Sequence, residues 1–254
     1  MTFCKCVQLV IGAAAITMVL GCSSLPGDIP KVDAKSLTDK DRNAAAMKSS
    51  YLELARIGDG KVFALDPKLS TVRMFSFRGG RAGRLGHNHV LSAPEFTGFA
   101  YLPGSVSADA KFDLEFRLDQ LEIDNPQYRE ALGGTFAAPL SKAAIEGVRE
   151  HMLGEDNLQA DRFPFVRIHS TQITGELPKF AAQMQVEMHG QKQLMWVPLS
   201  VEELSDRLAV KGAFVLRQTS FGATPYSVAG GLLAVKDEVI VEFHLVGALL
   251  LGSR

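Results

Sequence analysis

Two histidines that stand close together are the residues of this sequence best suited to chemistry. One residue separates His87 from His89, and alternate residues of a β-strand point to the same face. Both imidazoles could therefore reach one metal ion. A third ligand would come from another expected strand, as His169, His189 or His244. A metal site centred on His87 and His89 is thus one interpretation.

The residues around this pair favour two other interpretations. Gly83 and Gly86 precede the histidines and indicate a tight backbone bend, which hydrogen-bonded imidazoles would brace. The same imidazoles could instead meet the polar headgroup of a ligand. Arg81 and Arg84 could add contacts to a phosphate, or be ordinary solvated side chains. Three roles stay open for the histidines: structural brace, headgroup contact and metal ligand.

Other catalytic chemistry finds little support. Ser92, Ser170 and Ser220 lack the Gly-x-Ser-x-Gly elbow of serine hydrolases. The adjacent carboxylates of Glu202 and Glu203 fall in an expected surface turn, where water would solvate them. The sequence contains neither a Walker loop nor a dinucleotide-binding glycine motif. We therefore expect a protein that is not an enzyme and that needs no cofactor.

The N-terminal residues have the layout of an export signal. Lys5 supplies a positive charge, and a mainly apolar run follows from residue 7 to residue 20. This run is too short for a comfortable transmembrane helix of about 20 residues. Small residues then lead to Cys22. We expect residues 1–21 to be a signal peptide.

Cys22 carries the clearest chemical expectation of this region. The sequence Val19-Leu20-Gly21-Cys22 resembles the lipobox of bacterial lipoproteins, which implies cleavage before Cys22 and a diacylglycerol on its sulfur. Two acyl chains suffice for stable membrane anchoring. Ser23 and Ser24 follow, and by resemblance to known sorting signals they imply the outer membrane, facing the periplasm. An ordinary signal peptide or an uncleaved anchor is the alternative.

The amino-acid composition indicates a mature domain that has no disulfides and depends on a hydrophobic core. Cys4 and Cys6 would leave with the signal peptide, so after lipidation of Cys22 no thiol remains for a disulfide. Stability must then come from a hydrophobic core, which 46% hydrophobic residues can supply. The net charge is −1 and the basic residues form no cluster, which argues against a nucleic-acid partner.

The residues between the anchor and the main domain predict a tether and a short helix. Residues 23–38 are rich in Pro, Gly, Ser and Asp and offer little to a core. The apolar residues that follow recur at helical spacing: Ala44, Met47, Tyr51 and Leu54. Gly58 and Gly60 would end this helix. We assign residues 22–60 to the lipidated tether and helix.

From residue 61 onward the pattern changes to the two-residue period of β-strands. In residues 108–118 the even positions are apolar, and the odd positions from Asp109 to Arg117 are charged. This alternation predicts a strand between a core and water. Further strands are expected at 72–77, 95–102, 165–171, 184–188, 194–201, 208–216 and 239–245.

Two helical pieces interrupt these strands. Residues 126–132 follow the capping residues Asp124-Asn125 and begin with a proline. Residues 141–153 place apolar side chains on one face, and Gly154 closes them. Many antiparallel strands with one helical insertion favour a mainly β fold. We expect a closed antiparallel barrel, with a sandwich as the alternative.

Five stretches of the sequence occur in an order and spacing typical of one family. They are GRLGHNH at 83–89, EFTG at 95–98, ADRFPFVRIHST at 160–171, TSFGATP at 219–225 and GG at 230–231. With them the sequence resembles the YceI-like, polyisoprenoid-binding family over roughly residues 61–250. The helical insertion and the Gly-His-Asn-His segment are similar to one branch of that family.

This resemblance implies a lipocalin-like antiparallel β-barrel whose lumen holds a long isoprenoid chain. About eight strands can enclose either a packed core or one small ligand. The side chains expected to face the lumen and bind the ligand are Phe112, Leu114, Phe116, Met184, Val186, Met188, Val210 and Phe214. Flexible methionines suit an irregular ligand. The alternative is that these side chains simply pack against one another.

The sequence therefore predicts a periplasm-facing lipoprotein whose barrel domain, residues 61–251, binds a hydrophobic small molecule. This ligand would be an isoprenoid or similar lipid, and the membrane would be reached through the lipid on Cys22. A second hypothesis is a metal-binding envelope protein or metal-dependent enzyme that uses His87 and His89. A third is a structural envelope protein with a solid barrel. The oligomeric state stays open.

Overall fold

The computed structural model describes residues 34–104 and 109–251, which form three α-helices and twelve strands. The expected signal peptide 1–21, Cys22 and the tether up to residue 33 lie outside these described residues. Within them, every helix is too short or too polar to cross a bilayer.

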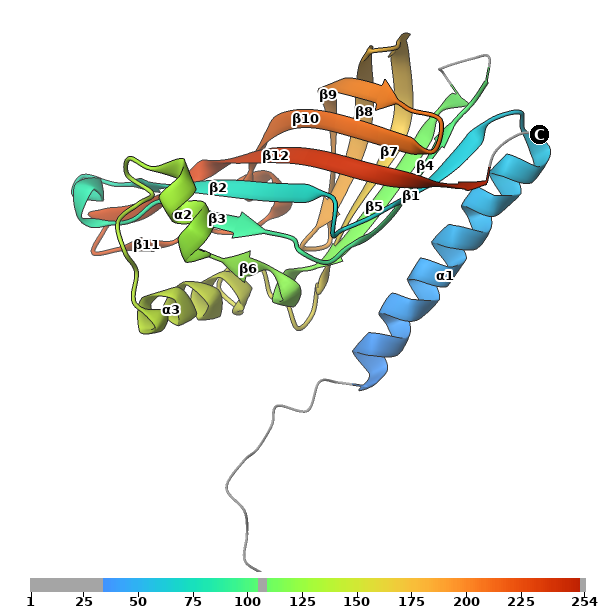
Figure 1. The fold of residues 1–254 in the computed structure, drawn as a ribbon. Coiled ribbons are helices and arrows are strands. Elements are labelled where there is room, and N and C mark those ends of the chain that lie inside the picture. The colour runs from blue at the N-terminus through green and yellow to red at the C-terminus, as the bar shows by residue number, and fades with distance from the viewer. Residues whose placement is uncertain (1–33, 105–108, 252–254) are drawn as a thin grey trace, which may run out of the picture.

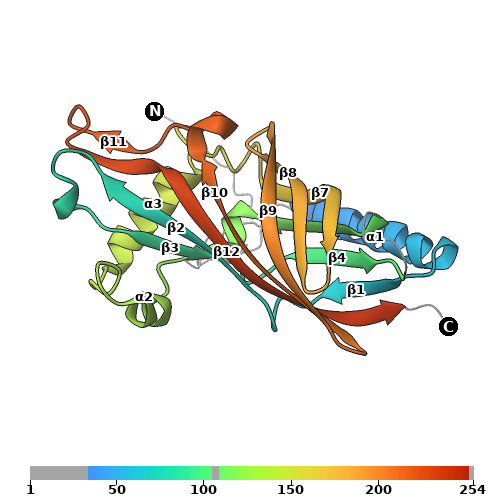
Figure 2. The same ribbon diagram turned by 90° about the horizontal axis from the view of Figure 1, so that it is seen from above.

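Eight antiparallel strands close into a barrel (Figures 1 and 2). Each strand pairs with the next in the order β1-β4-β5-β7-β8-β9-β10-β12, and β12 pairs again with β1. Closure removes unpaired strand edges, as the sequence pattern predicts. The barrel strands are β1 (Lys61–Leu65), β4 (Thr97–Leu102), β5 (Lys111–Arg117), β7 (Phe165–Glu176), β8 (Lys179–Met188), β9 (Gln191–Glu203), β10 (Arg207–Arg217) and β12 (Leu233–Leu251).

The strand β12 also carries a second, smaller set of strands. Residues 247–251 of β12 pair with β1, whereas residues 234–244 pair with β2. The sheet then continues from β2 to β3 and β6, so the barrel is split at this end (Figure 2). The added strands are β2 (Thr71–Gly79), β3 (His89–Ser92), β6 (Glu122–Ile123) and β11 (Ser227–Val228).

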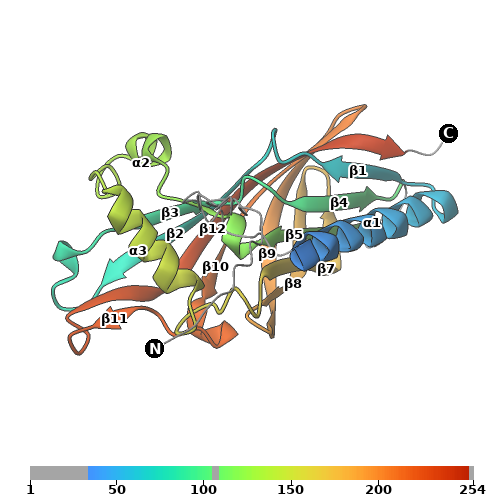
Figure 3. The same cartoon turned by 90° about the horizontal axis from the view of Figure 1, so that it is seen from below.

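Two capped helices lie beside the split end. Helix α2 (Pro126–Leu132) has its predicted bounds, and Asn125 caps it by accepting hydrogen bonds from two backbone N–H groups of the first turn. Helix α3 (Lys142–Leu153) begins one residue later than predicted, because Ser141 is its cap and accepts from the Ala144 N–H at 3.1 Å. Helix α3 lies below β2 and β3 in Figure 1 and in front of them when the molecule is seen from below in Figure 3.

The N-terminal helix α1 (Ala34–Ile57) begins earlier than its sequence pattern predicts and covers the outside of the barrel. It packs against β1 and β4, at the opposite end from α3 (Figure 3). Tyr51 is 2% exposed, stacks on Phe99 with 5.6 Å between ring centroids, and donates a hydrogen bond to Asp113 at 2.7 Å. Burial and the Asp113 carboxylate raise the pKa of Tyr51.

The charged face of β5 is only partly the water-exposed surface that its alternation predicts. Glu115 and Arg117 are 6% and 8% exposed. Glu115 accepts hydrogen bonds from Arg167 at 2.6 Å and from Asn43 of α1 at 3.4 Å. Arg117 pairs with Asp119 at 2.7 Å. Alternation of apolar and charged residues predicts a polar strand face. Ion pairs and a covering helix can provide hydrogen-bond partners for that face in place of water.

Candidate functional site

Two adjoining cavities lie inside the barrel. One of about 380 Å³, here named the chamber, lies at the split end between β3 and α3. The other, the inner pocket of about 100 Å³, lies within the closed barrel. The chamber has the size of a small-molecule site, commonly about 300–1,000 Å³. Four side chains line both cavities and form a shared waist: Val72, Ile168, Phe214 and Val241.

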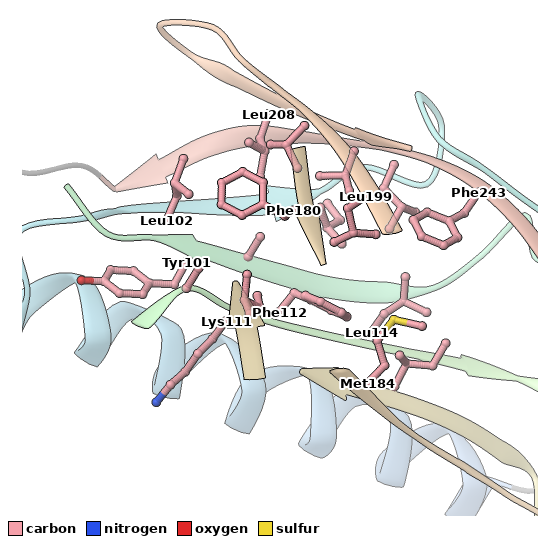
Figure 4. Close-up of a pocket in the computed structure, with 18 of the residues that line it drawn as sticks. Tyr101, Leu102, Lys111, Phe112, Leu114, Phe180, Met184, Leu199, Leu208 and Phe243 are labelled. Atoms are coloured by element: carbon pink, nitrogen blue, oxygen red, sulfur yellow. The ribbon is translucent and has the colours of Figure 1, made fainter. Parts of the chain in front are cut away.

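The inner pocket offers a ligand only apolar contacts. Figure 4 shows Leu114, Met184 and Phe243 among the side chains that surround it. Lys111 and Tyr101 also reach its wall, but the Lys111 ammonium and the Tyr101 hydroxyl point away from the other lining side chains. These two residues therefore contribute carbon atoms to the pocket, and the pocket suits a hydrocarbon chain.

The chamber has the polar groups that the inner pocket lacks. Its polar lining side chains are Ser76, His89, His151, Asn157, Gln218 and Tyr226. Among the described residues that line it there is no Asp, Glu, Lys or Arg. The chamber reaches solvent beside α3, where the rings of His151 and Tyr226 are exposed and lie 4.9 Å apart.

The structure places all eight side chains predicted to face the lumen at a cavity wall. Phe112, Leu114, Met184 and Val210 line the inner pocket, Phe116, Val186 and Met188 line the chamber, and Phe214 lines both. Phe112, Val210 and Phe214 are only half-buried because they border open space, whereas the other five are buried among neighbours. Ligand binding by these residues stays a prediction.

Behind the chamber wall, His89 belongs to a buried charged network. Its Nδ1 lies 2.6 Å from Oδ2 of Asp124, which is 1% exposed. The other carboxylate oxygen, Oδ1, accepts from the Val90 N–H at 3.0 Å and from Arg129 Nη1 at 2.6 Å. Arg129 also donates to two backbone carbonyl oxygens. Bonds to charged groups are strong, so the His89 ring is held in one orientation.

Asp124 is ionised in spite of its burial. Burial is the largest single influence and raises the pKa of Asp124. The hydrogen bond from His89, together with those from the Val90 N–H and Arg129, outweighs this effect, and the pKa of Asp124 is lowered. The local chain order explains this arrangement: β6 brings Asp124 beside β3, and the first turn of α2 returns Arg129 to it.

The prediction that His87 and His89 share one strand face is wrong. The strand β3 begins at His89, while His87 precedes it in a loop and is exposed. Asn88 fixes this loop: its Oδ1 accepts from the Arg78 N–H at 3.0 Å, and its Nδ2 donates to Thr135 Oγ1 at 2.8 Å. Only His89 lines the chamber.

The arrangement gives the metal hypothesis no support. Residues 34–104 and 109–251 contain no group of three His, Cys, Asp or Glu side chains that could hold an ion. His169 and His244 lie on β7 and β12, and His189 is hydrogen-bonded through Nδ1 to a backbone carbonyl oxygen.

Sequence patterns did not reveal Asp124, Arg129 or the contribution of α3. Asp124 stands beside Asn125 and a proline, so it looks like part of a helix cap. Its φ of 53°, in the left-handed region, has no signature in the sequence. Gly147 of α3 lines the chamber, and helical periodicity cannot show that its inner side meets open space.

Replacing Asp124 with asparagine should break the buried ion pair with Arg129 and lower the free energy of unfolding by about 3–5 kcal/mol. Because the folded-state pKa is lowered, this stabilisation is complete above the unfolded-state pKa of about 4 and is lost as pH falls through the folded value. Urea unfolding at several pH values should show the two proteins converging below about pH 4.

Asp119→Asn is the matched control, because the Asp119 side chain is 48% exposed in its pair with Arg117. It should cost less than about 1 kcal/mol. Equal stability of Asp124→Asn and the unsubstituted protein at neutral pH would contradict this account of the network.

Comparisons with known proteins bear on the family of this barrel. A sequence model of the YceI-like domain matches residues 63–247. BcnA of Burkholderia cenocepacia shares the fold, with a TM-score of 0.53 at 16% identity over 72% of this chain and 98% of its own. A Campylobacter jejuni YceI protein gives a TM-score of 0.45 at 7% identity, over 62% and 83%. A search of the curated proteins finds no match. Since the domain match spans most of the sequence, the chain belongs to the YceI-like family.

Proposed function

We propose that this protein binds a hydrophobic ligand, a polyisoprenoid or similar lipid, in the chamber and the inner pocket. The observation that supports this is the pair of adjoining cavities with a largely apolar wall. Burying an apolar chain there is favourable by roughly 25 cal/mol per Å². Such binding needs no catalytic group and no ion, so we propose a binding protein and not an enzyme.

The distribution of polar groups orients the ligand. Among the described residues, polar groups are presented only to the chamber, so the ligand's head would lie there and its tail would pass the waist into the inner pocket. Met184 lines the inner pocket and Met188 the chamber, and flexible methionines can adapt to an irregular chain. The two cavities together suit an amphiphile with a small head and a long tail.

The exposed rings of His151 and Tyr226 beside α3 mark the route by which the ligand would enter the chamber. None of the described α3 side chains is fully buried, although Val148 and Met152 pack partly on the core. An element with few buried contacts can open at low cost while the barrel stays intact. We propose that α3 moves when the ligand enters.

The hypothesis of a solid structural barrel has less support. Phe112, Val210 and Phe214 border open space, which a solid barrel would fill. Leu194 and Trp196 are exposed on the outer side of β9, at 59% and 50%. Two neighbouring apolar side chains are fewer than the extended exposed patch that marks a docking surface.

We also propose that a lipid on Cys22 tethers the barrel to the cell envelope, at the outer membrane facing the periplasm. The Val19-Leu20-Gly21-Cys22 sequence supports this. A membrane anchor would hold the barrel near the lipids that it binds.

Gly147 offers a way to fill the chamber without straining the backbone. A Cβ added there would meet no heavy atom within 4 Å, and replacing a glycine inside a helix favours the helix. Gly147→Phe should place its ring in the chamber and weaken binding of geranylgeraniol at least about tenfold by titration calorimetry. Gly147→Ala adds only a methyl group and should bind within about twofold of the unsubstituted protein. A folded Gly147→Phe variant with unchanged affinity would count against the chamber as the binding site.

Cys22→Ser should abolish lipidation because serine cannot form the thioether. In cells fed radiolabelled palmitate, the variant should lose the label and leave the membrane fraction. Cys6→Ser, within the expected signal peptide, is the control and should keep both. Persistent labelling of Cys22→Ser would show that the anchor lies elsewhere.

A further inference from the structure

The buried network fixes which nitrogen of His89 carries a proton. Oδ1 of Asp124 already accepts from Val90 and Arg129, and Oδ2 faces His89 Nδ1 at 2.6 Å. An ionised carboxylate can only accept, so Nδ1 must donate. The low pKa of Asp124 is consistent with this assignment.

With the hydrogen on Nδ1, the opposite nitrogen of the neutral ring is an acceptor. The positive charge of Arg129 and the negative charge of Asp124 cancel within the network. The neutral ring carries its hydrogen on Nδ1 and a lone pair on Nε2. Because the Nδ1 edge is turned to Asp124, Nε2 is the ring nitrogen left for the chamber.

A second acceptor also lines the chamber. Asn157 lines the chamber, and its Oδ1 is buried with no hydrogen-bond partner among the described residues. Leaving a buried polar atom unpaired costs about 1–3 kcal/mol, which a donating ligand would recover. Ser76 stands opposite His89 in the β2–β3 pairing, and its hydroxyl can either donate or accept.

The chamber lacks the groups that would hold an anionic head. No Lys or Arg belongs to its described lining, and Arg81 and Arg84 are exposed and line neither cavity. A phosphate would therefore lose its hydration without gaining a cationic partner.

We propose that the ligand's head is an uncharged hydrogen-bond donor, a hydroxyl or an amide N–H, which donates to Nε2 of His89. This inference rests on the proposed function and specifies its ligand class. Heads that only accept, such as ethers and ketones, leave both Nε2 of His89 and Oδ1 of Asn157 unpaired. Phosphate heads lack a counter-charge.

Three ligands with the same tail test this inference on the unsubstituted protein: geranylgeraniol, its methyl ether and its monophosphate. The alcohol should bind about 3- to 10-fold more tightly than the ether, the effect of about one hydrogen bond, and more tightly than the phosphate. Equal or tighter binding of the ether or the phosphate would overturn the inference and leave the proposed function standing. Absence of binding by all three would overturn both.

His89→Phe connects the preference to this residue. The variant should bind the alcohol and the ether equally, with its affinity for the ether within about twofold of the unsubstituted protein. His87→Phe is the control, since His87 is exposed outside the chamber, and it should keep the preference for the alcohol. A preference that survives in folded His89→Phe would overturn the assignment. If that variant does not fold, the comparison of ligands on the unsubstituted protein still decides.

Discussion

The nineteen-residue strand β12 pairs with β10, β1 and β2, and these pairings determine both the closed barrel and its split end. One side of β12 pairs with β10 over most of its length, while the other pairs with β2 and then with β1. The same strand therefore closes the barrel at one end and splits it at the other. The closed end encloses the apolar inner pocket, and the split end leaves the chamber beside α3. Two cavities of different polarity follow from this one strand.

The buried charges at the split end place a polar group on an otherwise apolar wall. Burying an isolated carboxylate at the position of Asp124 would cost free energy. Here Arg129 neutralises its charge, and His89 and the Val90 N–H form hydrogen bonds to it. The network bonds the Nδ1 edge of the His89 ring and leaves the Nε2 edge available to a ligand. The protein thereby presents an oriented acceptor to the chamber without placing a charge in it.

Two-residue alternation and helix caps made most of the architecture predictable. Each predicted strand overlaps an observed one, and the proline and Asn125 located α2. The strand β6 has only two residues, which is too short to show a two-residue repeat in the sequence. The sequence therefore did not predict that β6 brings Asp124 against β3. The alternation of apolar and charged residues in β5 likewise did not predict that α1 and Arg167 cover Glu115. Contacts between elements distant in sequence decided the site, and local patterns do not encode them.

A crystal structure of the protein soaked with geranylgeraniol would show directly whether one lipid occupies both cavities. We expect continuous density for one chain that runs from the chamber past Phe214 into the inner pocket, with its hydroxyl within hydrogen-bond distance of His89 Nε2. Cavities that remain empty or close through side-chain rearrangement, with geranylgeraniol bound only on the outer surface, would contradict the account.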